Sequence, residues 1–297
     1  MLTYLTTEQR NENSKRLDQM PTMEIIQTIN NEDKSIAEAV EAVLPNIAAA
    51  IDQISKSLMG GGRLFYVGAG TSGRLGILDA VECPPTFMTS PKMVQPIIAG
   101  GNGAIYKAVE GAEDDEVQGQ KDIKEKNLTD KDVVIGITAS GRTPYSIGAL
   151  KYANEVGAYT VSLTCNNNSL ISNFADCSIE VIVGPEVLSG STRMKAATAH
   201  KMILNMISTT TMIKLGKVYE NLMVDVRVSN FKLLERAKRI LMEITDISYE
   251  EATQLIAKAN NEVKPAIVMQ KSGVSFREAK KRLEESNGYV NIAIDYN

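Results

Sequence analysis

From Gly61 onward, short apolar runs alternate with segments of helical character. The apolar runs are bounded by Gly, Pro, Asn or Ser, a pattern typical of β-strands joined by crossover helices. Five strands are predicted, at residues 63–67, 94–98, 133–138, 159–164 and 178–183. The third run contains no polar side chain between Val133 and Ile137, as expected for a parallel strand buried on both faces. The pattern therefore predicts an α/β fold, with a five-stranded parallel sheet flanked by helices.

Helical periodicity precedes and follows this sheet. Apolar residues at spacings of three and four predict helices over 22–30 and 35–58. A longer helix is predicted to begin near Ser191 and Thr192 and to end at Gly216, because glycine is common just past helix C-termini.

The strand signals fade beyond about Val218. Short helices are predicted at 250–260, 263–270 and 275–285, separated by the breakers Pro265 and Gly273. We therefore expect an N-terminal helical segment (1–45), a central α/β domain (46–217) and a small all-helical C-terminal domain (218–297).

Charge and hydropathy narrow the possible partners. The 297 residues include 32 basic and 36 acidic ones, and a net charge of −4 gives no general reason to expect nucleic acid or an anionic membrane. No apolar run approaches the roughly 20 residues of a membrane-spanning helix. Met1–Arg10 is charged early and has no long apolar run behind it, so a cytoplasmic location is expected.

The cysteine and histidine content limits the chemistry. Cys83, Cys165 and Cys177 are irregularly spaced, which predicts buried, reduced thiols rather than disulfides or a zinc cluster. His200 is the only histidine, so sites that need two imidazoles are excluded. We expect His200 to be a packing residue; the alternative is that its helix directs it towards a partner's site. Carboxylates remain as acid and base, and no metal or other cofactor is expected.

The first predicted strand leads into Gly68-Ala69-Gly70-Thr71-Ser72-Gly73-Arg74, which opens a helix. This G-x-G-x-x-G string is a weak sign of dinucleotide binding. A dinucleotide site also needs an acidic residue at the end of the second strand, and Ala99-Gly100-Gly101-Asn102 supplies none. The loop is better explained by close contact of Gly70, Thr71, Ser72 and Gly73 with a phosphate at the helix N-terminus.

Two further hydroxyl-rich loops follow later strands. One contains Ser140, Gly141 and Thr143, and the other contains Ser189, Ser191 and Thr192. All three loops should meet at the carboxyl edge of a parallel sheet, where such folds bind ligands. The alternative is that Ser140, Thr143 and Ser191 only cap helices. The nearby cations would either supplement the phosphate contacts or be surface charges; they are Arg74, Arg142, Arg193 and Lys195.

These loops resemble the phosphate-binding loops of the sugar isomerase (SIS) domain family. More narrowly, residues 68–80 and 82–86 are similar to the N-acetylmuramic acid 6-phosphate etherase family, as are 99–101, 109–114 and 221–226. The resemblance begins at about Met20; Thr7–Asn11 matches the family's opening more loosely, and no role is assigned there. It implies cleavage of the ether between D-lactate and C3 of N-acetylmuramic acid 6-phosphate. It also implies a homodimeric enzyme with its site at or near the subunit interface.

By the same resemblance, Glu82 and Glu113 are the catalytic pair. Removal of the C2 proton next to an open-chain aldehyde permits elimination of lactate, and this needs one base and one acid. Glu113 is expected to exchange the C2 proton, and Glu82 to protonate the leaving oxygen and then activate water. A solvated helix charge remains the alternative for Glu113. For Glu82, its position before Pro84-Pro85 indicates a helix terminus.

Distance raises a question about Glu82. An unbroken helix from Gly70 would place its carboxylate on the order of 15 Å from the phosphate loop. Either the helix bends back, or Glu82 serves a neighbouring subunit's site.

Two other functions use the same loops. An aldose–ketose isomerase acting on an amino-sugar phosphate would need a base at C2 but no acid at C3. A non-catalytic sugar-phosphate sensor, similar to the glucokinase regulatory protein, would need neither glutamate. A DNA-binding regulator is disfavoured, because the N-terminal segment is short and weakly basic.

Overall fold

The structure is a computed structural model that describes residues 5–225 and 231–296. The chain forms two compact units. Met1–Ala80 with Lys92–Ser208 makes up the first, and Val81–Pro91 with Thr209–Asn297 makes up the second.

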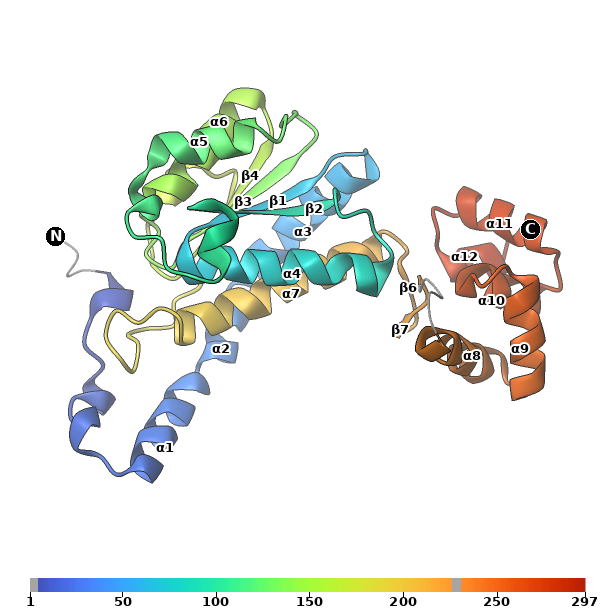
Figure 1. The fold of residues 1–297 in the computed structure, drawn as a ribbon, viewed down its shortest axis with the longest axis horizontal. Helices are drawn as coiled ribbons and strands as arrows, with labels where there is room; N and C mark the ends of the chain where they lie inside the picture. The colour runs from blue at the N-terminus through green and yellow to red at the C-terminus, as the bar shows by residue number, and fades with distance from the viewer. Residues whose placement is uncertain (1–4, 226–230, 297) are drawn as a thin grey trace. The chain divides into compact units, whose positions relative to one another are not determined.

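A five-stranded parallel sheet forms the centre of the first unit (Figure 1). Its strand order is β2-β1-β3-β4-β5, and every neighbouring pair is parallel. The strands are β1 (Leu64–Gly68), β2 (Val94–Ile98), β3 (Val133–Ile137), β4 (Tyr159–Thr164) and β5 (Cys177–Glu180). The predicted α/β class is therefore confirmed.

The last strand is shorter than predicted. It ends at Glu180 rather than at Val183, because Glu180 pairs with Thr164, the last residue of β4. The chain beyond it has no neighbouring strand to bond with, apart from one hydrogen bond from the Val181 N–H to the Thr164 carbonyl at 2.9 Å. Strand length is thus limited by the neighbouring strand rather than by the apolar run itself.

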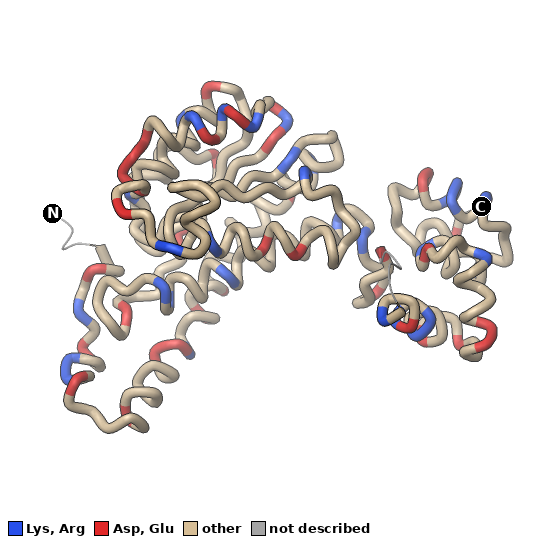
Figure 2. Tube along the Cα trace, in the orientation of Figure 1, with Lys and Arg blue, Asp and Glu red and all other residues tan. Residues whose placement is uncertain are grey.

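The sheet is buried on both faces. Strands β1, β2, β3 and β4 contain no charged residue, as the tan central traces of Figure 2 show. One face carries α5 (Glu116–Lys124) and α6 (Pro144–Val156), whose buried side chains join Phe65, Val67 and Val134 in one apolar cluster. Every residue of β1 and β3 is buried, which explains the continuous apolar run of β3.

Helices α4 (Gly70–Phe87) and α7 (Lys195–Lys214) lie side by side (Figure 1). Within the first unit they are joined through Asp79, which is buried. Its carboxylate accepts hydrogen bonds from Tyr66 Oη at 2.9 Å, Asn205 Nδ2 at 2.7 Å and Ser208 Oγ at 3.0 Å. Burial raises the pKa of Asp79, and the three donors oppose that rise. The network therefore fixes α4 and α7 together against the Tyr66 side of the sheet.

Helix α4 does not end before Pro84, as the sequence suggested. It continues to Phe87 with Pro84 and Pro85 inside it, and the Met88 N–H still bonds the Pro84 carbonyl at 3.0 Å. Helix α7 begins at Lys195 rather than at Ser191. Its first N–H groups are taken by the buried carboxylate of Glu186, which accepts from Lys195 N and Ala196 N at 2.9 Å each.

The N-terminal part contains short 3-10 turns between Thr6 and Gln19, followed by α1 (Thr22–Asp33), α2 (Ile36–Glu41) and α3 (Leu44–Met59). The single helix predicted over 35–58 is therefore two helices. Pro45 explains the break, since it lacks an N–H and lies in the first turn of α3, where none is required.

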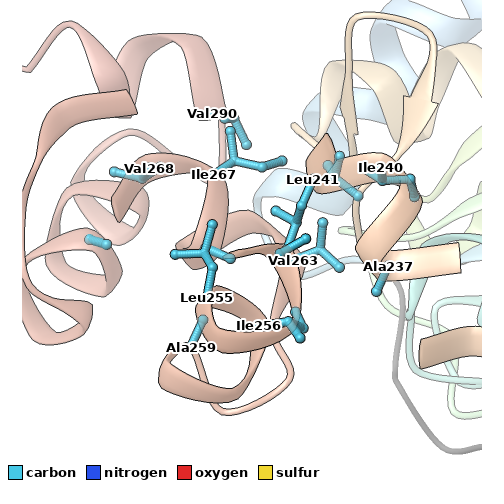
Figure 3. Close-up of a cluster of buried hydrophobic side chains, with 14 of the residues drawn as sticks. Ala237, Ile240, Leu241, Leu255, Ile256, Ala259, Val263, Ile267, Val268 and Val290 are labelled. Atoms are coloured by element: carbon cyan, nitrogen blue, oxygen red, sulfur yellow. The ribbon is translucent and has the colours of Figure 1, made fainter. Parts of the chain in front are cut away.

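The second unit is mostly helical, as predicted, and holds a core of its own (Figure 3). Its helices are α8 (Phe231–Thr245), α9 (Tyr249–Lys258), α10 (Val263–Ser272), α11 (Phe276–Glu285) and α12 (Val290–Ile294). Pro265 does not separate helices, because it occupies the first turn of α10. A two-stranded antiparallel hairpin of β6 (Val218–Tyr219) and β7 (Leu222–Met223) was not predicted. Among the described residues, no helix is both long and apolar enough to span a bilayer.

Candidate functional site

A cavity of about 410 Å³ in the first unit joins the loops that follow several strands. Four of the predicted hydroxyl residues line it: Ser72, Ser140, Thr143 and Thr192. Strands β1 and β3 lie where the strand order reverses, which is the usual ligand position in open parallel sheets. The volume is in the range of small-molecule sites, about 300–1,000 Å³. The hydroxyl-rich loops therefore meet at one cavity, as expected, through these four residues.

The loop after β1 is built from closely packed glycines. A Cβ on Gly73 would lie 2.6 Å from Ile98 Cγ1 and 2.7 Å from the Gly68 carbonyl oxygen. Gly70 has a positive φ of 52° and opens α4, so glycine is favoured there by conformation. Gly70 lines a smaller adjoining cavity, and Thr71 is half-buried in the first turn of the helix without lining either cavity. The Gly73 N–H donates to the Ala69 carbonyl at 3.2 Å, and the N-terminus of the helix favours an anion at this turn.

The loop after β3 is held by its own hydroxyl groups. Thr138 Oγ1 lies 2.7 Å from Thr143 Oγ1 and 3.3 Å from Ser140 Oγ, and Ser140 Oγ also accepts from the Arg142 N–H at 3.2 Å. Gly141 has a φ of +72°, and a Cβ there would lie 2.2 Å from Ser169 Oγ. Thr143 stands at the N-cap position of α6 but makes no capping hydrogen bond. Simple helix capping therefore does not account for Thr143.

The loop after β5 is closed at its base by Glu186, whose carboxylate binds the first N–H groups of α7. This explains why Ser191 is not the cap of that helix. Gly190 and Thr192 line the cavity, whereas Ser189 and Ser191 lie in the same loop without lining it. Lys195, buried at the start of α7, forms an ion pair with Glu32 at 2.9 Å and is therefore a structural cation.

Glu113 lies at the junction of two cavities. It belongs to a 3-10 turn (Ala112–Asp114) after the left-handed Gly111, and it lines both the 410 Å³ cavity and the adjoining one of about 220 Å³. Asp114 lines the larger cavity as well. The predicted catalytic base therefore stands next to the predicted phosphate loops.

Glu82 is elsewhere. It is exposed on α4, which is one helix from Gly70 to Phe87, and it does not line the cavity. Glu82 falls in the second unit, within Val81–Pro91, whereas the residues that line the cavity belong to the first unit.

Arg142 is the only one of the four candidate cations that lines the cavity. Arg74 donates from Nε to the Ile105 carbonyl at 3.0 Å, which fixes the segment after β2. Arg193 is exposed and lines no part of the cavity.

Sequence patterns gave no role to Leu5 and Glu8, yet both line the same cavity. The sequence resemblance is loose over Thr7–Asn11 and assigns no role to these residues. Glu186 and Asn166, which anchor the surrounding loops, were missed because single buried polar residues show no periodicity. Among residues 5–225 and 231–296, no group of three or more His, Cys, Asp or Glu residues is arranged to hold a metal ion.

His200 is fully buried in α7, with its Nε2 3.3 Å from Cys165 Sγ. All three cysteines are free and buried, as predicted. Burial lowers the pKa of His200 from 6.5 to about 4 and raises the pKa of the Cys165 thiol. Neither group contacts the cavity, so the packing role expected of His200 matches its position.

This burial predicts a pH effect on stability. The unfolded chain protonates His200 below about pH 6.5, whereas the native state keeps it neutral until about pH 4. The free energy of unfolding should therefore fall by roughly 3 kcal/mol as the pH drops across that window, at about 1.4 kcal/mol per pKa unit. Urea unfolding at pH 7 and pH 4.5 should show this loss in the parent and not in His200→Leu. Equal losses in both proteins would contradict the prediction.

Comparison with known proteins identifies the class. Residues 46–154 match the model of the glucokinase regulatory protein N-terminal SIS domain, and residues 106–209 match that of the SIS domain. Residues 220–265 match the C-terminal lid domain of glucokinase regulatory protein. A phosphoheptose isomerase from Francisella tularensis shares the fold, with a TM-score of 0.51 and 18% identity over 65% of this chain and all of that one. Together with the loops at the sheet edge, these matches define a SIS-domain protein with a helical C-terminal region.

Curated relatives narrow the class to one family. The chain is 60% identical to N-acetylmuramic acid 6-phosphate etherase 1 of Bacillus licheniformis, over 98% of this chain and 95% of the relative. It is 56% identical to the N-acetylmuramic acid 6-phosphate etherase of Bacillus subtilis, over 98% of this chain and 96% of the relative. The chain belongs to the N-acetylmuramic acid 6-phosphate etherase family.

Proposed function

We propose that the protein is a carbon–oxygen lyase that cleaves the D-lactyl ether of N-acetylmuramic acid 6-phosphate. The products are N-acetylglucosamine 6-phosphate and D-lactate, in the catabolism and recycling of cell-wall amino sugars. The observation that carries this proposal is the near full-length identity to relatives of that name, together with a cavity that joins hydroxyl-rich loops and Glu113.

The substrate is held by its phosphate in this proposal. The helix N-termini of α4 and α6 supply backbone N–H groups, and side-chain hydroxyls supply further donors. The proposed substrate-binding residues are Gly70, Thr71, Ser72, Gly73, Ser140, Gly141, Thr143, Ser189, Ser191 and Thr192.

Two carboxylates carry the chemistry. In the open-chain sugar, Glu113 takes the C2 proton, and the electron pair of that C–H bond is held as an enolate with the C1 aldehyde oxygen. The enolate electron pair then forms the C2–C3 double bond as the C3–O bond breaks. Glu82 gives its proton to the leaving oxygen, and D-lactate departs. Glu82 then takes a proton from water as the water oxygen adds to C3, and Glu113 returns the proton to C2. The scheme draws on no cofactor.

Glu82 acts on the site of a second copy of the chain. The support for a homodimer is that Glu82 does not line the cavity that joins Glu113 to the phosphate loops. Exposed apolar side chains on α4 flank Glu82, with Leu78 49% and Val81 52% exposed. Such a strip is the kind of surface that a partner covers. The proposed site therefore lies at or near a subunit interface.

We place the enzyme in the cytoplasm. Three free, buried cysteines suit a reducing compartment.

One incubation tests the activity. Purified protein with N-acetylmuramic acid 6-phosphate in ¹⁸O-labelled water should release D-lactate and place one solvent oxygen at C3 of the sugar product. Formation of a ketose without lactate would instead indicate an isomerase. Binding without any turnover would indicate a sugar-phosphate sensor, and either result would overturn the proposal.

A further inference from the structure

We propose that Glu8 is a substrate-contacting residue whose carboxylate accepts a hydrogen bond from a hydroxyl or amide N–H of the sugar. This inference rests on the proposed function, because it concerns the same cavity. Glu8 lines that cavity although it lies more than 60 residues before the first phosphate loop in the sequence. Nothing in the family resemblance assigned it a role.

The segment that carries Glu8 is held in place by buried polar contacts. Asn166, which is 2% exposed, accepts from the Thr6 N–H at 2.7 Å and donates to Thr7 Oγ1 at 3.1 Å. The same Asn166 side chain donates to the Ala139 carbonyl at 3.0 Å, next to Ser140 in the loop after β3. One amide thus joins the Glu8 turn to a substrate loop.

A second set of contacts ties the segment to the loop after β5. Ser14 Oγ donates to the Val187 carbonyl at 2.7 Å, and Asn11 Nδ2 donates to the Pro185 carbonyl at 3.3 Å. Leu5 is only 4% exposed and lines the cavity beside Glu8. The N-terminal turn is therefore part of the cavity wall and not a loose extension.

The Glu8 carboxylate itself is left available. It makes no hydrogen bond or ion pair with any other residue that the structure describes, whereas Glu12 in the same segment is paired with Lys15 at 2.6 Å. Glu8 Oε2 lies beside Gly190, since a Cβ added to Gly190 would come 3.5 Å from it. Glu8 therefore faces the cavity at the loop after β5.

Charge decides what Glu8 contacts. A carboxylate accepts hydrogen bonds only and repels anions, so it cannot hold the phosphate or the lactyl carboxylate. Arg142, the cation that lines the cavity, belongs instead to the loop after β3. We therefore place the phosphate at the loops after β1 and β3. The uncharged part of the sugar, which carries hydrogen-bond donors, then lies between Glu8 and Thr192.

The test compares binding of the whole substrate with binding of phosphate alone. Glu8→Ala should raise the KM for lactate release about 10- to 100-fold, the effect of losing a hydrogen bond to a charged group. Inhibition by inorganic phosphate should stay the same or become stronger, because a negative charge has been removed. Glu8→Gln, which keeps an acceptor oxygen, should fall between Glu8→Ala and the parent.

Two further variants give the experiment its controls. Glu12→Gln should behave as the parent, because Glu12 is exposed and does not line the cavity. Ser72→Ala should weaken substrate and inorganic phosphate together. Glu8→Ala with parental kinetics would overturn the inference, and so would a parallel loss of phosphate inhibition, which would mean that the loops themselves had been disturbed.

The Glu8 contact can also be tested if the protein lacks the proposed lyase activity. If the parent protein releases no lactate, the same variants can be compared by calorimetric binding of N-acetylglucosamine 6-phosphate and of inorganic phosphate. A selective loss of sugar-phosphate affinity in Glu8→Ala would still support the contact, and an unchanged affinity would still refute it.

Discussion

Glu113→Gln is expected to lower kcat for D-lactate release by about 10⁴-fold, the upper end for one general acid–base group. The amide has nearly the same shape as the carboxylate but cannot accept the C2 proton or return it. Because the substitution leaves the phosphate loops intact, KM should change little. Steady-state release of D-lactate from N-acetylmuramic acid 6-phosphate measures both constants.

Hydrogen exchange identifies the step that is lost. In deuterated water, the parent should introduce deuterium at C2 of the product, and Glu113→Gln should not exchange the C2 hydrogen of the substrate. Glu125→Gln, an exposed carboxylate just past α5, is the matched control and should keep parental rates. Persistent C2 exchange in Glu113→Gln would assign the base to another residue.

Glu82→Gln is expected to lower kcat by about 10³-fold through loss of the acid that protonates the leaving oxygen. The base at C2 would remain, so this variant should still exchange the C2 hydrogen with solvent while releasing almost no lactate. The two glutamate variants are therefore separable by one isotope measurement. Loss of exchange in Glu82→Gln and its retention in Glu113→Gln would reverse the assigned roles.

A heterodimer tests which subunit Glu82 serves. Glu82→Gln and Ser72→Asp chains with different tags can be purified as a mixed pair, in which the aspartate repels the phosphate in one site. If Glu82 acts across the interface, one of the two sites is intact and about half of the parental rate should return. If each site uses its own Glu82, both sites are defective and the mixed pair should be inactive.

The parts of the fold that were predicted well have signals in a few consecutive residues. Short, mostly apolar runs located all five strands, and every residue of β1 and β3 is buried, as expected of parallel strands covered on both faces. The boundaries of the elements depended on partners outside each element: β5 ends where β4 ends, and α7 begins where Glu186 binds its N–H groups. Helix α8 was missed although Leu234, Ala237 and Leu241 carry a clear helical spacing.

The contacts of Asp225, in the second half of the Asn221–Val226 motif, were also visible only in the tertiary structure. Asp225 forms ion pairs with Lys217 at 2.9 Å and Lys264 at 3.0 Å, which join the start of the helical unit to α10. Burial lowers the pKa of Lys264, and the Asp225 carboxylate opposes that effect. Val226 lies outside the described residues. Sequence spacing could not have paired Asp225 with Lys264, because these two residues are 39 positions apart in the chain.

The sequence by itself determined the α/β class and the hydroxyl- and glycine-rich loops, and its short motifs carry the family resemblance from which Glu82 and Glu113 are proposed as acid and base. These depend on local composition and on short motifs, which act within one strand or one turn. Only the tertiary structure decided that Ser72, Glu113, Ser140 and Thr192 share one cavity, that Glu82 does not, and that Glu8 does. The physical reason is that a parallel sheet gathers loops at one edge in spatial order, and that single buried hydrogen bonds, such as those of Asn166, fix segments 160 residues apart.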